Sequence, residues 1–392
     1  MNISRIFRRA INSAVLLTLL GRTASAETPT LVYFGTMSGK KGTGIYVSRL
    51  DRTSGQLSAP ELAAETASPG FLAIHPSQPF LFSVGEMKNA TRQPSGAVNA
   101  WAIDPKTGKL SFLNQESSGG IGPAHLTVDK TGNLVLVANY GSGSVSAIPI
   151  HAGHLGRPTA FQQHAGSSIN PHRQREPHAH SVNVDPANRF AFVADLGVDA
   201  VMIYKFDSKT GTLIPNNPRE AAVEPGSGPR HLAFHPSARF AYVINEMLCT
   251  ITAFAYDAKT GQLKTLQTIS TLPAGQAVEP SFSTAEVQVH PSGKFLYGSN
   301  RGHDTIAAFA IDEQTGQLSL LQHESTQGKI PRNFGVDPNG EFLLAANQNS
   351  DSVVVFRIDA KSGRIAPTGQ KVEVPSPVCV KFLMPPMTQA SR

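Results

Sequence analysis

The sequence predicts an all-β protein: a seven-bladed β-propeller of four-stranded antiparallel blades, closed by pairing of its N- and C-terminal strands. Three observations predict this fold. A turn motif recurs at a spacing of about 50 residues through most of the chain. Short segments that alternate apolar and polar residues separate the motifs, as expected of half-buried strands. The two ends of the repeating region supply complementary parts of one repeat.

The turn motif is Asp-x-x-Thr/Ser-Gly-x-Leu/Ile. Its Asp can accept hydrogen bonds from backbone N–H groups of the turn, and its Gly can adopt the positive φ needed before the next strand. This chemistry favours a structural turn between the third and fourth strands over calcium binding. Full copies lie at Asp51–Leu57, Asp104–Leu110, Asp207–Leu213, Asp257–Leu263, Asp312–Leu318 and Asp359–Ile365, and a shortened copy is His151–Leu155. These seven copies predict seven blades.

A second turn joins the first two strands of each blade. It starts with His or Asp, at His75, Asp129, Asp185, His235, His290 and Asp337. Alternating runs such as 134–137 and 342–345 follow it and are predicted second strands, and 305–309 is a predicted third strand. Because His and Asp replace each other at this position, we interpret its histidines as turn residues.

The ends of the repeating region predict how the ring closes. Residues 31–64 supply only the second, third and fourth strands of a blade, whereas 377–382 resembles a lone first strand. Pairing these segments completes the seventh blade and leaves no open sheet edge. We therefore expect one propeller domain spanning residues 27–392.

The charge of the chain is concentrated in its first 26 residues. The formal net charge is +6, from 34 basic and 28 acidic residues, and residues 1–26 hold four arginines and no acid. The remainder has 34 − 4 = 30 basic against 28 acidic residues, which argues against a nucleic-acid-binding protein. A basic start, the apolar run 14–20 and Ala24-Ser25-Ala26 are typical of a signal peptide. We expect an exported protein, periplasmic or secreted, with no membrane span.

Two positions of the repeat are predicted to surround one mouth of the central channel. One follows the second strand, after an Asn that recurs at Asn139, Asn245, Asn300 and Asn347 and is expected to bond the backbone. The residue at this position varies from blade to blade: it is Glu86, Tyr140, Leu196, Glu246, Arg301 and Gln348. Variation among polar residues on a constant scaffold is typical of a functional site.

The other position lies five residues before the His/Asp turn. It holds Ala124, His180, Arg230, Ala285 and Arg332. The loop 164–180 before it is rich in His and Arg, and its end, Pro177–His180, is the part we expect to contribute. The predicted catalytic residues are His180, Glu246, Arg230 and Arg301, and the predicted substrate-binding residues are His178, Arg332, His125 and Gln348.

These residue types suit acid–base chemistry on a polar substrate. A carboxylate and an imidazole can exchange protons near neutral pH, and arginines can bind an anion or a developing oxyanion. Arg230 and Glu246 could instead form only a structural ion pair. His178 and His180 have no further metal-ligating residue in register, so no metal and no cofactor are predicted.

The segments Gly228–Pro236, Ala285–Tyr297, Ser299–Gly302 and Pro331–Phe334 resemble the seven-bladed propeller lactonases. That family includes propeller-type 6-phosphogluconolactonases and fungal-type carboxy-cis,cis-muconate cyclases, and the resemblance covers residues 30–384. It implies a channel-mouth group of one His, one Glu and two Arg, matching His180 or His178, Arg230, Glu246 and Arg301. The predicted leader departs from the pattern, because 6-phosphogluconolactone is a cytoplasmic metabolite.

The expected function is therefore a cofactor-independent lactonase that hydrolyses a small lactone, with anionic sugar lactones among the candidate substrates. In this hypothesis Glu246 activates water, Arg230 and Arg301 hold the carbonyl oxygen, and His180 protonates the leaving alcohol. A cyclase acting on an unsaturated carboxylate is the alternative. A non-catalytic secreted propeller that binds a ligand or protein, and a metal-dependent gluconolactonase-like enzyme, also stay open, as does the oligomeric state.

Overall fold

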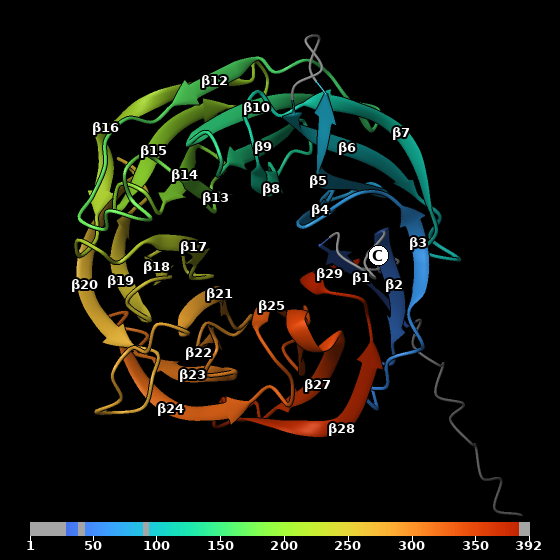
Figure 1. Ribbon diagram of the computed structural model, residues 1–392, viewed down its shortest axis with the longest axis vertical. Coiled ribbons are helices and arrows are strands. Elements are labelled where there is room, and N and C mark those ends of the chain that lie inside the picture. The colour runs from blue at the N-terminus through green and yellow to red at the C-terminus, as the bar shows by residue number, and fades with distance from the viewer. Residues whose placement is uncertain (1–28, 38–43, 89–93, 384–392) are drawn as a thin grey trace, which may run out of the picture.

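The computed structural model describes residues 29–37, 44–88 and 94–383. Seven antiparallel sheets form a ring around a central channel, which confirms the predicted propeller (Figure 1). The only helical element among the described residues is a 3₁₀ turn, η1 (Gln348–Ser350). None of these residues belongs to a helix long and apolar enough to cross a membrane. The predicted signal peptide, residues 1–26, lies outside the described residues.

We number the blades from the N-terminus and name the strand nearest the channel first. Blade 1 contains β29 (Pro377–Leu383), β1 (Thr30–Thr36), β2 (Gly44–Leu50) and β3 (Glu61–Glu65). Blade 2 contains β4 (Leu72–Ile74), β5 (Phe80–Lys88), β6 (Pro94–Ile103) and β7 (Leu110–Ser117). Blade 3 contains β8 (Pro123–Val128), β9 (Leu134–Asn139), β10 (Ser144–His151), β11 (His154–Leu155) and β12 (Ala160–Gln163).

The other four blades follow the same order without interruption. Blade 4 contains β13 (Ala179–Val184), β14 (Phe190–Asp195), β15 (Ala200–Asp207) and β16 (Thr212–Ala222). Blade 5 contains β17 (Pro229–Phe234), β18 (Phe240–Asn245), β19 (Thr250–Asp257) and β20 (Gln262–Ser270). Blade 6 contains β21 (Ser283–Val289), β22 (Phe295–Arg301), β23 (Thr305–Ile311) and β24 (Leu318–Ser325). Blade 7 contains β25 (Pro331–Val336), β26 (Phe342–Asn347), β27 (Ser352–Ile358) and β28 (Ile365–Glu373).

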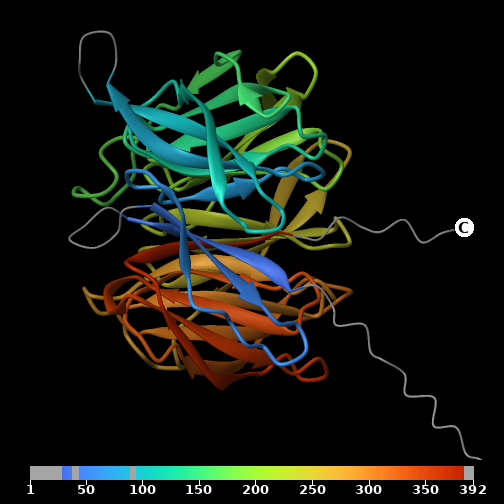
Figure 2. The same ribbon diagram turned by 90° about the vertical axis from the view of Figure 1, so that its right-hand side faces the viewer.

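The ring closes through its two terminal strands, as predicted. β29 pairs antiparallel with β1, from Leu31 opposite Leu383 to Thr36 opposite Pro377. Turned by 90°, the blue N-terminal strands lie beside the red C-terminal strand (Figure 2). The innermost strand of blade 1 is thus added from the far end of the chain.

The outer edge of blade 3 differs from the others. Its third strand, β10, pairs with the short β11 at one end and with β12 at the other, so the fourth strand is split into two pieces. This break coincides with the shortened turn motif, His151–Leu155, where Gly153 has a φ of +84°.

The two turn motifs hold neighbouring blades together at the face opposite the site. Asp51 Oδ1 accepts hydrogen bonds from the backbone N–H groups of Thr53 and Ser54. The turn histidines reach the next blade, as where His235 Nε2 lies 2.8 Å from the Gly293 carbonyl oxygen. These contacts support the interpretation of both motifs as structural.

The hydrophobic core lies between blades and not within one. Blades 6 and 7, for example, share a buried cluster that includes Tyr297, Phe334, Leu343 and Phe356. The strands present one apolar face to each neighbouring sheet, so every blade is buried on both sides. This rigid packing fixes the strand ends around the channel, where the candidate site lies.

Candidate active site

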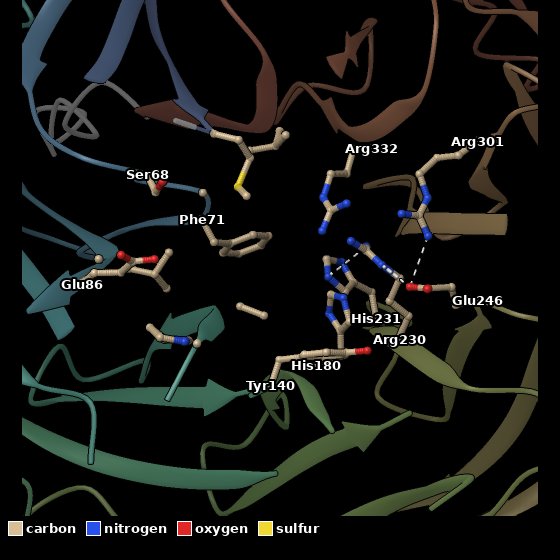
Figure 3. A pocket seen from close by; sticks show the side chains of 18 of the residues that line it. Ser68, Phe71, Glu86, Tyr140, His180, Arg230, His231, Glu246, Arg301 and Arg332 are labelled. Atoms are coloured by element: carbon tan, nitrogen blue, oxygen red, sulfur yellow. Dashed lines mark hydrogen bonds and ion pairs between the residues drawn. The ribbon is translucent and has the colours of Figure 1, made fainter. Parts of the chain in front are cut away.

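A cavity of about 510 Å³ opens at one mouth of the channel. Arginines gather on one side of it, around Glu246, whereas Phe71, Ser68 and Glu86 lie on the opposite side (Figure 3). The lining residues are Met37, Ser68, Gly70, Phe71, Val84, Gly85, Glu86, Gly122, Pro123, Ala124, Tyr140, Arg173, His180, Arg230, His231, Glu246, Arg301, Arg332 and Val378. The cavity is large enough for a small ligand.

A β-bulge at the start of the first strand directs side chains of that strand into the cavity. Pairing in β17 jumps from Pro229 to His231 and leaves Arg230 out of register. The same shift occurs at the start of β8, β13 and β25, whereas pairing in β21 jumps from Thr284 to Val287 and leaves Ala285 and Glu286 out of register. An extra residue at a bulge redirects side chains that strict alternation would send to opposite faces. Both Arg230 and His231 accordingly line the cavity.

A backbone hydrogen bond that recurs in different blades positions the residue after the second strand. The N–H of Glu246 donates to the Gly228 carbonyl at 2.7 Å, and that of Tyr140 donates to the Gly122 carbonyl at 2.9 Å. The recurring Asn before this position helps to fix it, since Asn300 Nδ2 donates to the Thr271 carbonyl. The two positions inferred from the repeat therefore share one geometry in different blades.

Glu246 is the centre of the charged wall. Its Oε1 accepts from Arg173 Nη2 at 2.8 Å, and its Oε2 lies 3.2 Å from Arg230 Nε and 3.1 Å from Arg301 Nη2. Burial opposes ionisation of this carboxyl, but Arg301, Arg230 and Arg173 outweigh burial and lower its pKa to about 2. Glu246 is thus a firmly ionised anchor for three guanidinium groups.

His180 lies in the cavity as an uncharged base. It is buried between Tyr140 and His231, with ring centroids 5.4 and 5.3 Å away. Burial, followed by the charge of Arg230, lowers the pKa of His180 well below its usual value. Its Nδ1 atom has no hydrogen-bond partner among the described residues. A neutral imidazole can take up a proton.

Two arginines retain unused donors. Arg301 Nη2 donates to the Thr284 carbonyl at 2.7 Å, yet its buried Nε atom finds no partner among the described residues. Arg332 points into the cavity and makes no hydrogen bond or ion pair with the part of the chain described here (Figure 3). Burial and the charge of Arg301 lower the pKa of Arg332. An anionic group in the cavity could use the donors of Arg332.

Arg173 reaches the site from a loop outside the repeat. Asp195 holds both ends of this loop: its Oδ2 lies 2.6 Å from His164 Nδ1, and its Oδ1 accepts from the His178 N–H at 2.7 Å. Buried Gln174 donates to the Leu196 carbonyl. The loop is therefore pinned beside the channel mouth, where Arg173 also donates to the Tyr140 hydroxyl.

The floor of the cavity is a layer of aromatic rings. Phe71 lies 4.1 Å from His125 and 5.7 Å from His231 between ring centroids. Below it, a separate cavity of about 290 Å³ is lined by His125 and Lys381. His125 and Lys381 therefore belong to a different cavity from the arginines.

The predicted site residues fall into two groups. The first group lines the cavity of about 510 Å³, which we call the upper cavity: His180, Glu246, Arg230, Arg301 and Arg332. His178, His125 and Gln348 are not among its lining residues.

Each of these three residues has another setting. His178 stacks on Tyr140 at 4.5 Å and bonds the Tyr140 carbonyl. His125 lies beneath Phe71. It directly follows Ala124 in the bulged strand β8. Gln348 begins the 3₁₀ turn η1, which replaces the loop found in the other blades.

Three residues in or directly beside the site were not predicted from the sequence. Arg173 has no counterpart in other blades, so no repeat position could have indicated it. His231 and Glu286 directly follow the residues Arg230 and Ala285 of the second predicted position. Pairs of adjacent polar residues there, also His180-Ser181 and Arg332-Asn333, were a signal for the bulge.

Metal-binding groups do not gather in the part of the chain that the structure describes. No set of three or more His, Cys, Asp or Glu side chains there could hold a metal ion. The acidic residue at its centre, Glu246, instead pairs with Arg173, Arg230 and Arg301.

Fold and site together define a propeller lactonase. The family model "Lactonase, 7-bladed beta-propeller" matches residues 31–382. The chain therefore belongs to this family, which confirms the predicted resemblance and its lactone hydrolase class.

Individual relatives are similar over nearly the whole chain. A 6-phosphogluconolactonase of Bacillus subtilis is 36% identical over 90% of this chain and 97% of its own length. One of Formosa agariphila is 35% identical over 78% of this chain and 86% of its own. The solved periplasmic gluconolactonase of Pseudomonas aeruginosa superposes with a TM-score of 0.83 at 33% identity, covering 91% of this chain and 99% of that one.

Proposed function

We propose that the protein hydrolyses a small sugar lactone in the upper cavity, with His180 as the proton-transfer group and the arginines as the oxyanion site. The observation that carries this proposal is the neutral His180, which lines the same cavity as Arg230, Arg301 and Arg332. A base beside fixed cationic donors suits attack of water on an ester carbonyl.

The reaction needs one water molecule and no cofactor. His180 accepts a proton as the water oxygen bonds to the lactone carbonyl carbon, and the carbonyl oxygen becomes an oxyanion. The arginines stabilise that charge, which also favours the nearby imidazolium. The ring C–O bond then breaks, and His180 returns its proton to the alcohol oxygen. The product is the open hydroxy acid, which releases its carboxylic proton to solvent.

Glu246 suits a different role from the water activation expected from sequence. With a pKa of about 2 it is a weak base at neutral pH. Its bonds to three arginines instead hold these donors at fixed positions. Fixed donors need no reorganisation when the oxyanion forms, which is the main source of their catalytic value.

The charge balance of the cavity supports a polar or anionic lactone. Four arginines line it against two glutamates, and only Glu246 contacts the arginines. The names of the relatives suggest two substrates for this chain, a gluconolactone and 6-phosphogluconolactone. Either would belong to carbohydrate metabolism.

Export supports the unphosphorylated substrate. Residues 1–26 carry the features of a signal peptide, and the Pseudomonas aeruginosa relative is described as periplasmic. An exported enzyme would meet free sugar lactones rather than a cytoplasmic phosphate ester. Fractionation of cells that express the full chain, beside a variant without residues 2–26, tests the location. Equal cytoplasmic retention of both forms contradicts export.

The function is tested by a hydrolysis screen over gluconolactone, 6-phosphogluconolactone and acyl lactones, with and without a chelator. We expect turnover of a sugar lactone that the chelator leaves unchanged and that His180→Asn reduces by about a hundredfold or more. No turnover of any lactone would favour a binding protein. Turnover of an unsaturated carboxylate in the cyclising direction alone would favour the cyclase. Loss of activity with chelator would favour a metal-dependent enzyme.

A further inference from the structure

A buried hydrogen-bond network lies directly below the arginine side of the cavity. His231 Nε2 lies 3.2 Å from Arg230 Nη1, and His231 Nδ1 lies 3.1 Å from Glu286 Oε2 (Figure 3 shows the Arg230–His231 contact). Glu286 Oε2 also accepts from Asn333 Nδ2, and Asn333 Oδ1 accepts from the Val380 N–H. The network therefore joins blades 5, 6 and 7 to the closing strand β29.

The donors in this network determine which atom of each hydrogen bond donates and which accepts. A guanidinium group can only donate, so His231 Nε2 must accept from Arg230. The ring hydrogen of neutral His231 therefore sits on Nδ1 and is donated to Glu286. Glu286 Oε1 accepts in addition from the Val287 N–H. Burial raises the pKa of Glu286 to about 7, and its Oε2 atom lies where it can accept the Nδ1 hydrogen, so Arg230 and Glu286 together favour this tautomer of His231.

The position of His231 and Glu286 in the repeat holds no carboxylate in the blades on the other side of the channel. There the equivalent residues are His125 and Ser181, and His125 packs against Phe71. Blade closure therefore does not require a carboxylate at this position. A buried carboxylate is costly unless it is paired, and here it occurs only beneath the arginines.

We propose that Glu286 is a positioning residue for the hydrolysis: through the Nδ1–H tautomer of His231 it fixes the orientation of Arg230. This inference rests on the proposed function. Arg230 Nε is held by Glu246, and its Nη1 by the Ala285 carbonyl and His231. Its Nη2 group, which bonds no described residue, is left to donate to the lactone oxygen. Glu286 itself does not line the cavity.

Glu286→Gln tests the proposal because it keeps the shape and changes the polarity. The glutamine NH₂ would face His231 Nδ1, Asn333 Nδ2 or the Val287 N–H. We expect His231 to move its hydrogen to Nε2, which then opposes the Arg230 donor. The expected result is a fall in kcat of about tenfold to a hundredfold with little change in KM. The ring nitrogen shifts of His231, measured by NMR on histidine-labelled protein, should show the tautomer change.

His235→Asn is the matched control. His235 lies at the other end of β17, is buried like His231, and also bonds the next blade through Nε2. This variant should lose thermal stability without changing kcat or the His231 tautomer. Unchanged kcat in a folded Glu286→Gln protein would overturn the proposal, as would an equal fall in kcat in both variants.

The tautomer also tests the inference when a variant does not fold or when no lactone is turned over. In the wild-type protein we expect the His231 hydrogen on Nδ1, and a hydrogen on Nε2 overturns the inference. Absence of hydrolysis in the wild type with the Nδ1–H tautomer present contradicts the proposed function and leaves the network as described.

Discussion

Arg230 Nε lies 3.2 Å from Glu246 Oε2, although the two residues are 16 positions apart in the chain. Their neighbours Pro229 and Asn245 face each other across strands β17 and β18. This ion pair therefore forms within one blade. Arg301 and Arg173, the other partners of Glu246, come from blade 6 and from the loop before blade 4. Blade 5 carries the core of the site, and its neighbours complete it.

Glu246→Gln should reduce both stability and activity. The folded state lowers the pKa of Glu246 from 4.5 to about 2, which corresponds to about 3 kcal/mol of unfolding free energy at pH 7. Because the folded pKa is the lower one, this stabilisation is complete above pH 4.5 and is lost as the pH falls towards 2. Urea unfolding of both proteins should therefore give a difference that shrinks over this range.

Glu61→Gln is the control for that measurement. Glu61 also contacts two cations, Arg49 and Lys109, but on the surface, where its side chain is 52% exposed. Exposed ion pairs contribute about 1 kcal/mol or less. An equal loss in both variants would show that burial adds nothing to the Glu246 cluster.

The pH dependence of hydrolysis should report His180. Burial and Arg230 lower the pKa of this imidazole, so the neutral, active form persists to lower pH than for an ordinary histidine. We expect kcat/KM to stay level as the pH falls to 6.5 and to decline only well below that value. A decline with its midpoint at or above 6.5 would contradict a low pKa for the group. His180→Asn should remove the decline together with most of the activity.

Arg332→Gln should discriminate between charged and neutral lactones. Arg332 lines the cavity and has no ion pair with any residue that the structure describes. One charge-assisted hydrogen bond is worth about 1.5–3 kcal/mol, so KM for a phosphorylated or carboxylated lactone should rise about tenfold to a hundredfold. KM for a neutral lactone should change little. An equal rise in KM for both kinds of lactone would show that Arg332 does not distinguish charged from neutral substrates.

Gly316→Ala should destabilise the fold more than Gly275→Ala does. Gly316 has a φ of +73°, and a Cβ there would lie 2.4 Å from the Phe240 ring. Gly275 has a similar φ of +79°, but nothing lies within 4 Å of its Cβ position. The backbone cost of about 1 kcal/mol is common to both, and only Gly316→Ala adds about 1–3 kcal/mol of overpacking. Equal melting temperatures for the two variants would contradict interblade packing at this turn.

The sequence predicted the fold well because its signals are local. Turns such as Asp51–Leu57 form largely from their own residues, and counting this motif with its shortened copy gives the number of blades. Comparing repeats likewise located His180, Arg230, Glu246 and Arg301. The order of positions along the blade fixes where such residues lie in space.

The site was predicted less completely because its details depart from the repeat. Strict alternation of side chains along a strand places His231 away from Arg230, whereas the bulge in β17 brings both to the cavity. Arg173 arrives from a loop whose position depends on Asp195, far from it in sequence. Neither a local pattern nor a repeat position encodes such contacts.

The closing strand β29 also contributes to the site. Val378 lines the cavity, and the Val380 N–H bonds Asn333, which in turn bonds Glu286. These are among the last described residues to leave the ribosome, and they complete the first blade. During synthesis, the chain therefore carries the four arginines before β29 is available to complete the cavity at Val378. Catalytic competence should appear in one late step, when β29 inserts beside β1, and a nascent chain that lacks this strand should be inert.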